Sequence, residues 1–204
     1  VFNELEISPF LKSTLLHKGC TYLEYLSTYA PFVLIDGFYR STVTLLSRFI
    51  YYWRGQILGR QRRFQIRAGF IFETAVANEL KKQGFIVQNV RRINRREFDV
   101  VTVRNEVICN IQCKNNFTNL EQVESDPLRF AKYNYRLVKY YERSLFKEKI
   151  REHLLTQKLS INRIEHMIVS RFPVITDNPR FVPYSRIADF AKIADEAMAC
   201  DAFL

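Results

Sequence analysis

Two short β-rich runs on either side of a turn constrain the fold more than any other feature of the chain. They form the sequence EFDVVTVRNEVICNIQCK at residues 97–114. Asn105 and Glu106 between them fit the short loop of a β-hairpin. With that loop Arg104 faces Val107, and a four-residue loop gives the same register. The sequence therefore predicts an antiparallel pair of strands with a defined register.

Continuing this register outward brings four polar side chains together. Asp99 is then opposite Gln112, and Glu97 is opposite Lys114. Because side chains alternate across a strand, all four are expected to project from one face. The residues expected on the other face are Val100, Cys109, Ile111 and Cys113. An acid, an amide oxygen and an ammonium group within a few ångströms can hold a hard divalent cation beside an anionic substrate.

The segment before the hairpin predicts an amphipathic helix from about Gly69 to Gln83, ended by Gly84. One carboxylate, Glu73, falls within its apolar stripe, at three- and four-residue spacings. The stripe consists of Phe70, Glu73, Val76, Ala77 and Leu80. A buried carboxylate needs a partner, because leaving it unpaired is costly. A metal ion is one such partner, and a salt bridge to Lys114 or to an arginine is another.

Strands and helices are interspersed over residues 68–204, which predicts an α/β fold with a central mixed sheet flanked by helices. The further expected elements are strands at Phe85–Val90, His166–Phe172 and Arg180–Tyr184, and helices from Pro127 to about His153 and from Ser185 to Ala199. Ser185 is the expected N-cap of the closing helix.

Residues 1–67 form a separate region that is expected to be all-helical. Apolar residues recur at helical spacing in three segments, which are Leu11–Leu16, Tyr22–Tyr29 and Thr42–Trp53. This region carries no chemical motif. Charged residues interrupt its most apolar stretch, so we expect a core helix and no membrane span.

Basic residues exceed acidic ones, 31 to 21, and leave a net charge of +10. The excess is clustered between Arg54 and Arg67, between Arg91 and Arg96, and between Arg129 and Arg151. Such clusters bind phosphate, and the tyrosines within the last of them can stack on bases. We therefore expect nucleic acid as the partner. Solvated helix faces, or contacts with proteins or membranes, are the alternatives.

The four cysteines show no metal-binding or disulfide spacing. They are Cys20, Cys109, Cys113 and Cys200. Free thiols in a reducing, cytoplasmic compartment are the expected state. The chain begins at Val1 without a methionine, which is consistent with a fragment of a longer protein.

Taken in order, these residues resemble a known nuclease superfamily. Glu73 in an early helix, Asp99 on a strand and Gln112-Cys113-Lys114 on the next strand are similar to the PD-(D/E)XK superfamily, which has the restriction-endonuclease-like fold. Glutamine before xK resembles the Mrr-like branch. The resemblance covers about residues 69–190, with Phe98 where the family name has proline. The neutral Gln112 should weaken metal affinity or favour a single tightly held ion.

The resemblance implies a metal-dependent nuclease, with endonuclease action expected and DNA preferred over RNA. Its reaction would be in-line attack of water on a phosphodiester. The resemblance further implies that Asp99 is the central ligand of Mg²⁺ or Mn²⁺, with the Gln112 side-chain oxygen and the Cys113 main-chain carbonyl beside it. Glu73 would bind the metal directly or through water. Lys114 would orient or help to deprotonate the attacking water and stabilise charge on the phosphate.

Flanking residues have expected roles as well. Glu97 is either an extra ligand or, as we favour, the cross-strand ion-pair partner of Lys114. The residues expected to bind nucleic acid are Arg91, Arg92, Arg95, Arg96, Lys132, Tyr135 and Lys139. A homodimer is left open, because many enzymes of this fold cut both strands as dimers. The neutral Gln112 also motivates an alternative, a degenerate nuclease fold that binds nucleic acid without cleaving it.

Overall fold

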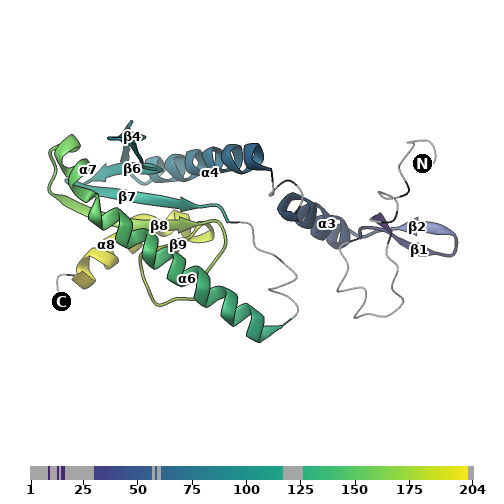
Figure 1. Cartoon of the computed structure of the whole chain (residues 1–204). Coiled ribbons are helices and arrows are strands. Elements are labelled where there is room, and N and C mark those ends of the chain that lie inside the picture. The colour runs from purple at the N-terminus through teal and green to yellow at the C-terminus, as the bar shows by residue number, and fades with distance from the viewer. Residues whose placement is uncertain are drawn as a thin grey trace. The chain divides into compact units, whose positions relative to one another are not determined.

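The computed structural model describes residues 30–56, 58, 61–116 and 126–201, together with residues 9, 13, 15 and 16. Figure 1 shows the elements along the chain. The chain divides into two compact units, one of Val1–Phe64 with Phe117–Arg129 and one of Gln65–Asn116 with Phe130–Leu204. The domain boundary expected after residue 67 stays a prediction.

The first unit contains a β-hairpin that the sequence analysis did not predict. Strands β1 (Val33–Ile35) and β2 (Phe38–Arg40) pair antiparallel. Asp36 and Gly37 connect them with φ angles of 51° and 77°. An Asp-Gly pair is a strong signal for a two-residue hairpin turn, because both positions require positive φ. The prediction that residues 1–67 are all-helical is therefore wrong for this segment.

Helix α3 (Val43–Gln56) confirms the helix expected at Thr42–Trp53. The Thr42 hydroxyl accepts a hydrogen bond from the Leu45 main-chain N–H at 3.2 Å, which caps the start of the helix. The helices expected at Leu11–Leu16 and Tyr22–Tyr29 lie largely outside the described residues. No helix in the described part of the chain combines the length and apolarity needed to cross a bilayer.

The second unit is built on a mixed five-stranded sheet. Its strands are β3 (Ile86–Val87), β6 (Val100–Arg104), β7 (Val107–Lys114), β8 (Arg163–Ser170) and β9 (Phe181–Pro183). They lie in the order β3-β6-β7-β8-β9. The first two pairings are antiparallel and the last two are parallel. A separate small hairpin, β4 (Arg92–Ile93) with β5 (Arg96–Glu97), precedes β6.

Helices cover both faces of this sheet, which confirms the expected α/β class. They are α4 (Arg62–Lys82), α6 (Pro127–Ile150), α7 (Glu152–Leu159), the 3-10 helix η2 (Tyr184–Asp189) and α8 (Phe190–Asp201). Helix α4 starts earlier than expected, and Gly84 follows its end at a φ of 83°. Ser185 is no N-cap, because a 3-10 turn after Pro183 begins the closing segment.

The sheet has one core on each side. Helices α4 and α8 pack on the first face, where Val76, Leu80 and Phe190 are fully buried against Ile111 and Met167. Helices α6 and α7 pack on the second face, and α6 is seen in front of the strands in Figure 1. The sheet therefore forms the middle layer of three.

The register of the β6–β7 hairpin is the predicted one. Arg104 pairs with Val107, and the pairing runs to Val100 opposite Ile111. Asn105 and Glu106 form the turn with φ angles of 51° and 59°. Strand β6 begins at Val100, whereas β7 continues to Lys114. The last residues of β7 therefore extend past the end of β6, and the sheet opens there.

Candidate functional site

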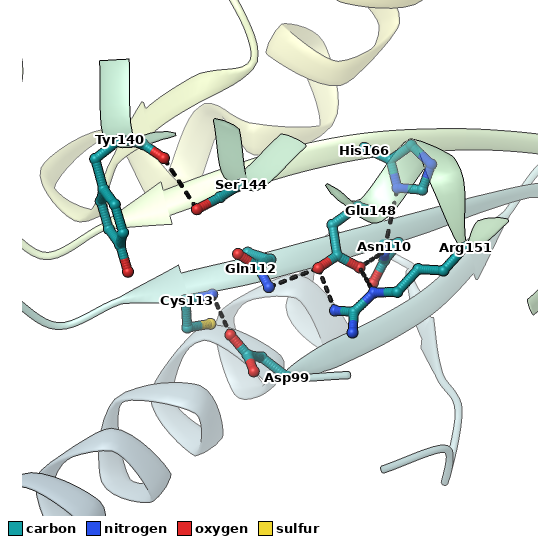
Figure 2. A network of polar contacts seen from close by, with 9 residues as sticks. All are labelled: Asp99, Asn110, Gln112, Cys113, Tyr140, Ser144, Glu148, Arg151 and His166. Carbon is teal, nitrogen blue, oxygen red and sulfur yellow. Dashed lines mark hydrogen bonds and ion pairs between the residues drawn. The ribbon is translucent and has the colours of Figure 1, made fainter. Parts of the chain in front are cut away.

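Asp99 lies in a bend immediately before β6, where the sheet opens. Its Oδ2 atom accepts a hydrogen bond from the Cys113 main-chain N–H at 2.8 Å, as Figure 2 shows. In an extended strand the N–H and C=O of one residue point to the same side. The Cys113 carbonyl is therefore directed toward Asp99, whereas the Lys114 carbonyl accepts from Arg171 on the β8 side at 2.9 Å.

Glu73 reaches the same region from helix α4. It is half-buried at the edge of the apolar stripe, in which Phe72, Val76 and Leu80 are the buried residues. Phe70, which was expected in that stripe, is 48% exposed. Glu73 and Asp99 line one open cavity of about 320 Å³ between α4 and the start of β6. The helix thus directs this carboxylate toward an open cavity and not into the apolar core.

Both carboxylates have raised pKa values. Burial is the main cause for Glu73, and the charge of Asp99 adds to it. Burial also raises the pKa of Asp99, against the opposing effects of the Cys113 N–H and of the Lys114 charge. Within the described residues no lysine or arginine forms an ion pair with Glu73. The salt bridge that was the alternative to a metal ion is therefore not formed among these residues, although the charge of Arg91 acts to lower the pKa of Glu73.

Gln112 and Lys114 lie toward helix α6, on the second face of the sheet. The Lys114 Nζ atom is 5.1 Å from the centre of the Tyr140 ring. Gln112 donates its amide to Glu148 Oε1 at 2.6 Å. The Lys114 charge is close enough to Asp99 to oppose the effect of burial on the pKa of that carboxyl. Asp99 is thus the residue that links the α4 side of the site with the α6 side.

Glu97 is not the partner of Lys114, and that prediction is wrong. Glu97 is in the β4–β5 hairpin, where Arg92 is its partner in the strand register. The side chains of these two residues also form an ion pair. Asn94 and Arg95 form the hairpin turn with φ angles of 45° and 65°. Phe98, the residue after Glu97, is buried in the second core. The predicted register of β6 therefore does not extend back to Glu97.

Oxygen atoms of the kind that hard divalent cations prefer lie near this end of the sheet, but Gln112 and Lys114 do not line the cavity of Glu73 and Asp99. The Gln112 Oε1 atom is buried and has no hydrogen-bond partner among the described residues. Carboxylate, amide and main-chain carbonyl oxygens are ligand types that suit Mg²⁺ or Mn²⁺. The described part of the chain holds no cluster of three or more His, Cys, Asp or Glu side chains arranged for a metal.

The predicted nucleic-acid residues are all exposed. They are Arg91, Arg92, Arg95 and Arg96 around the β4–β5 hairpin, and Lys132, Tyr135 and Lys139 on α6. Arg91 lines the cavity of Glu73 and Asp99, and its guanidinium lies 5.2 Å from the Phe70 ring. Lys139 pairs with Glu142 at 2.9 Å.

One residue next to the site, Glu148, was not predicted from the sequence. It is only 1% exposed, and its carboxylate accepts hydrogen bonds from Asn110, Gln112 and Arg151. A signal for its burial exists, because Tyr141, Ser144 and Glu148 recur at helical spacing on one face of α6.

Comparisons of the chain with protein-family models, with curated proteins and with solved structures found no match. Function therefore has to follow from the side chains at the open end of the sheet and from their chemistry.

Proposed function

We propose that this chain is a metal-dependent nuclease that hydrolyses phosphodiester bonds, with DNA as the preferred substrate. The proposal includes a restriction-endonuclease-like core of the PD-(D/E)XK type. One observation carries it. Glu73 and Asp99 line a single cavity at the open end of the sheet, and Asp99 lies within the electrostatic influence of Lys114.

The electrostatics of the site support a role for a cation. Two carboxylates with raised pKa values are costly to keep charged near one another, and a bound divalent ion would offset that cost. Asp99, Glu73, the Gln112 Oε1 atom and the Cys113 carbonyl would hold Mg²⁺ or Mn²⁺. When bound, the ion supplies Lewis acidity that activates a water and neutralises charge on the phosphate.

The side chains then have separate tasks. Glu73 and Asp99 hold and orient the attacking water through their oxygens. The Lys114 ammonium group, kept at the site by the Tyr140 ring, donates to phosphate oxygens as negative charge builds there. The water oxygen forms a new P–O bond while the P–O bond to the leaving oxygen breaks. The attacking water loses its proton to solvent, and the leaving oxygen gains one.

The exposed arginines are placed to hold the nucleic-acid backbone. Arg91 lines the cavity itself, and the β4–β5 hairpin that carries Arg92, Arg95 and Arg96 follows directly. Such side chains bind phosphate without reading sequence. A basic rim beside paired acids gives the substrate affinity that the acids alone would oppose.

A second function is a module that binds nucleic acid without cutting it. The specific observation in its favour is the neutral Gln112, whose amide is already bonded to Glu148. A site with one fewer negative ligand holds a divalent cation less tightly. Both functions predict DNA binding, and only the first predicts hydrolysis.

The test compares the purified chain with a Lys114→Ala variant prepared in parallel. Each is incubated with circular DNA, linear DNA and RNA in Mg²⁺ or Mn²⁺, and one series contains EDTA. We expect wild-type cutting that stops in EDTA and in the variant, while the variant still retards DNA in a gel. Retardation by both proteins without cutting in either metal would establish the binding module instead. Equal cutting by both proteins would contradict the role of Lys114.

A further inference from the structure

The buried Glu148 carboxylate accepts hydrogen bonds from other side chains of the protein. Its Oε1 atom accepts from Gln112 at 2.6 Å, and its Oε2 atom accepts from Asn110 and from the Arg151 Nε at 2.9 Å each. The Arg151 Nη2 donates to Oε1 as well. Figure 2 shows these hydrogen bonds converging on Glu148 from β7 and from the end of α6.

A carboxylate that faces an amide fixes which way the amide points. An ionised carboxylate only accepts hydrogen bonds, so the NH₂ group of Gln112 must face Glu148. The Gln112 Oε1 atom is then on the side away from Glu148, as Figure 2 shows, and no described residue bonds to it. A buried carbonyl oxygen without a partner is costly, which points to a ligand at this position.

Glu148 also acts on the other side of the site. Burial is the main cause of the raised pKa of Asp99, the charge of Glu148 adds to it, and the charge of Arg151 opposes it. The Arg151 guanidinium is itself held 4.8 Å from the Phe98 ring, next to Asp99 in the chain. The Glu148–Arg151 pair is therefore a fixed part of the surroundings of both Gln112 and Asp99.

We propose that Glu148 is a positioning residue, which locks the Gln112 amide so that its oxygen is available to a divalent cation. This inference rests on the proposed metal-dependent function. It also accounts for a neutral residue in the position where the resemblance leads one to expect an acid. The negative charge lies one hydrogen bond behind Gln112, on α6, and not on β7.

Calorimetric titration of the full chain with Mn²⁺, without nucleic acid, tests the inference. In Glu148→Gln the side chain at 148 is no longer an obligatory acceptor, so the Gln112 amide is free to turn over. We expect Mn²⁺ affinity to fall by about tenfold or more, as for other residues that orient metal ligands. Gln112→Ala should weaken binding to a similar extent.

The matched control is Glu165→Gln. Glu165 is another buried acid on the sheet, and it is bonded to Arg180 at 2.6 Å. It pairs with Cys109 in the register, away from Gln112. The same chemical change there should lower stability and leave Mn²⁺ affinity unchanged. An equal loss of affinity in both variants would overturn the positioning role, because general loosening of the fold would explain it.

If the Glu148→Gln variant does not fold, the test uses a reciprocal double variant, Gln112→Glu with Glu148→Gln. It keeps one carboxylate, one amide and a hydrogen bond between them, although the Arg151 Nη2 atom loses its acceptor at the Oε1 position, and it presents a carboxylate oxygen to the cation. We expect Mn²⁺ affinity at or above the wild-type value. A folded reciprocal variant that binds no Mn²⁺ would overturn the inference, as would wild-type affinity in a folded Glu148→Gln. Failure of the wild type to bind Mn²⁺ or to cut would instead overturn the proposed function.

Discussion

The Asp99 carboxylate occupies the position that a neighbouring strand would fill beside Cys113. Its Oδ2 atom accepts the Cys113 N–H at 2.8 Å, just beyond the last paired residues of β6 and β7. One side chain thus has two tasks, since it satisfies a main-chain donor of the sheet and lines the cavity that holds Glu73.

These two tasks can be separated by substitution. In Asp99→Asn an oxygen is still available to the Cys113 N–H, so stability should change little. Asp99→Ala leaves that donor without its partner and should cost about 1 kcal/mol of unfolding free energy. DNA cleavage should be lost in both. Chemical denaturation and a cleavage assay measure the two effects, and equal stability of the two variants would contradict the structural task.

The burial of His166 leads us to predict that the protein loses stability in mild acid. Burial lowers the pKa of His166 below its ordinary value of 6.5, although Glu152, Glu148 and Glu165 oppose the shift. The unfolded chain therefore binds the proton more readily than the folded one, and stability present above pH 6.5 is lost as the pH falls. Thermal melts of the wild type and of His166→Gln should converge on acidification. The exposed His153→Gln is the control, and a constant difference for His166→Gln would contradict the prediction.

Substitution of two glycines by alanine is expected to change stability in opposite directions. Gly84 has a φ of 83°, where an L-residue is strained, so Gly84→Ala should destabilise the protein by about 1–2 kcal/mol. Gly69 lies inside α4, and a Cβ there would come no closer than 3.9 Å to another atom, the Glu73 Oε1. Gly69→Ala should therefore stabilise the protein by up to about 1 kcal/mol. Urea denaturation of the two variants checks both signs.

The arginines around the β4–β5 hairpin predict a salt-dependent DNA affinity. Arg91→Gln combined with Arg96→Gln should weaken binding and reduce the slope of log K against log salt by about 0.9 for each phosphate that is no longer neutralised. Lys158→Gln combined with Lys192→Gln makes the same change of charge on α7 and α8. Gel retardation at several salt concentrations compares the pairs. An equal effect of both pairs would mean that net charge, and not this surface, binds DNA.

The β6–β7 hairpin could be predicted because its information is local. Asn105 and Glu106 adopt the positive φ angles of a two-residue turn, and this fixes every pair up to Val100 opposite Ile111. Prediction failed one step further. Phe98 is buried in the second core with Leu155, and this packing joins residues distant in sequence. The burial of Phe98 removes Glu97 from strand β6. The alternation of polar and apolar residues along a strand carries no information about such packing.

Glu148 was missed for a similar reason. It is 36 residues from Gln112 along the chain, in a segment dominated by basic residues. Its hydrogen bond with Gln112 depends on how α6 packs on the sheet. The hairpin at Asp36 and Gly37, in contrast, has a local signal in the Asp-Gly pair, which outweighs the helical spacing of the flanking segments.

The end of β7 that extends past β6 has a consequence for solubility. Main-chain groups at the free end of a strand are a template for a strand of another molecule, and such an edge invites aggregation. The Asp99 carboxylate blocks the Cys113 N–H, and the charged Lys114 ends the strand. Both features are of the kind that disfavours the addition of a strand from another copy of the chain.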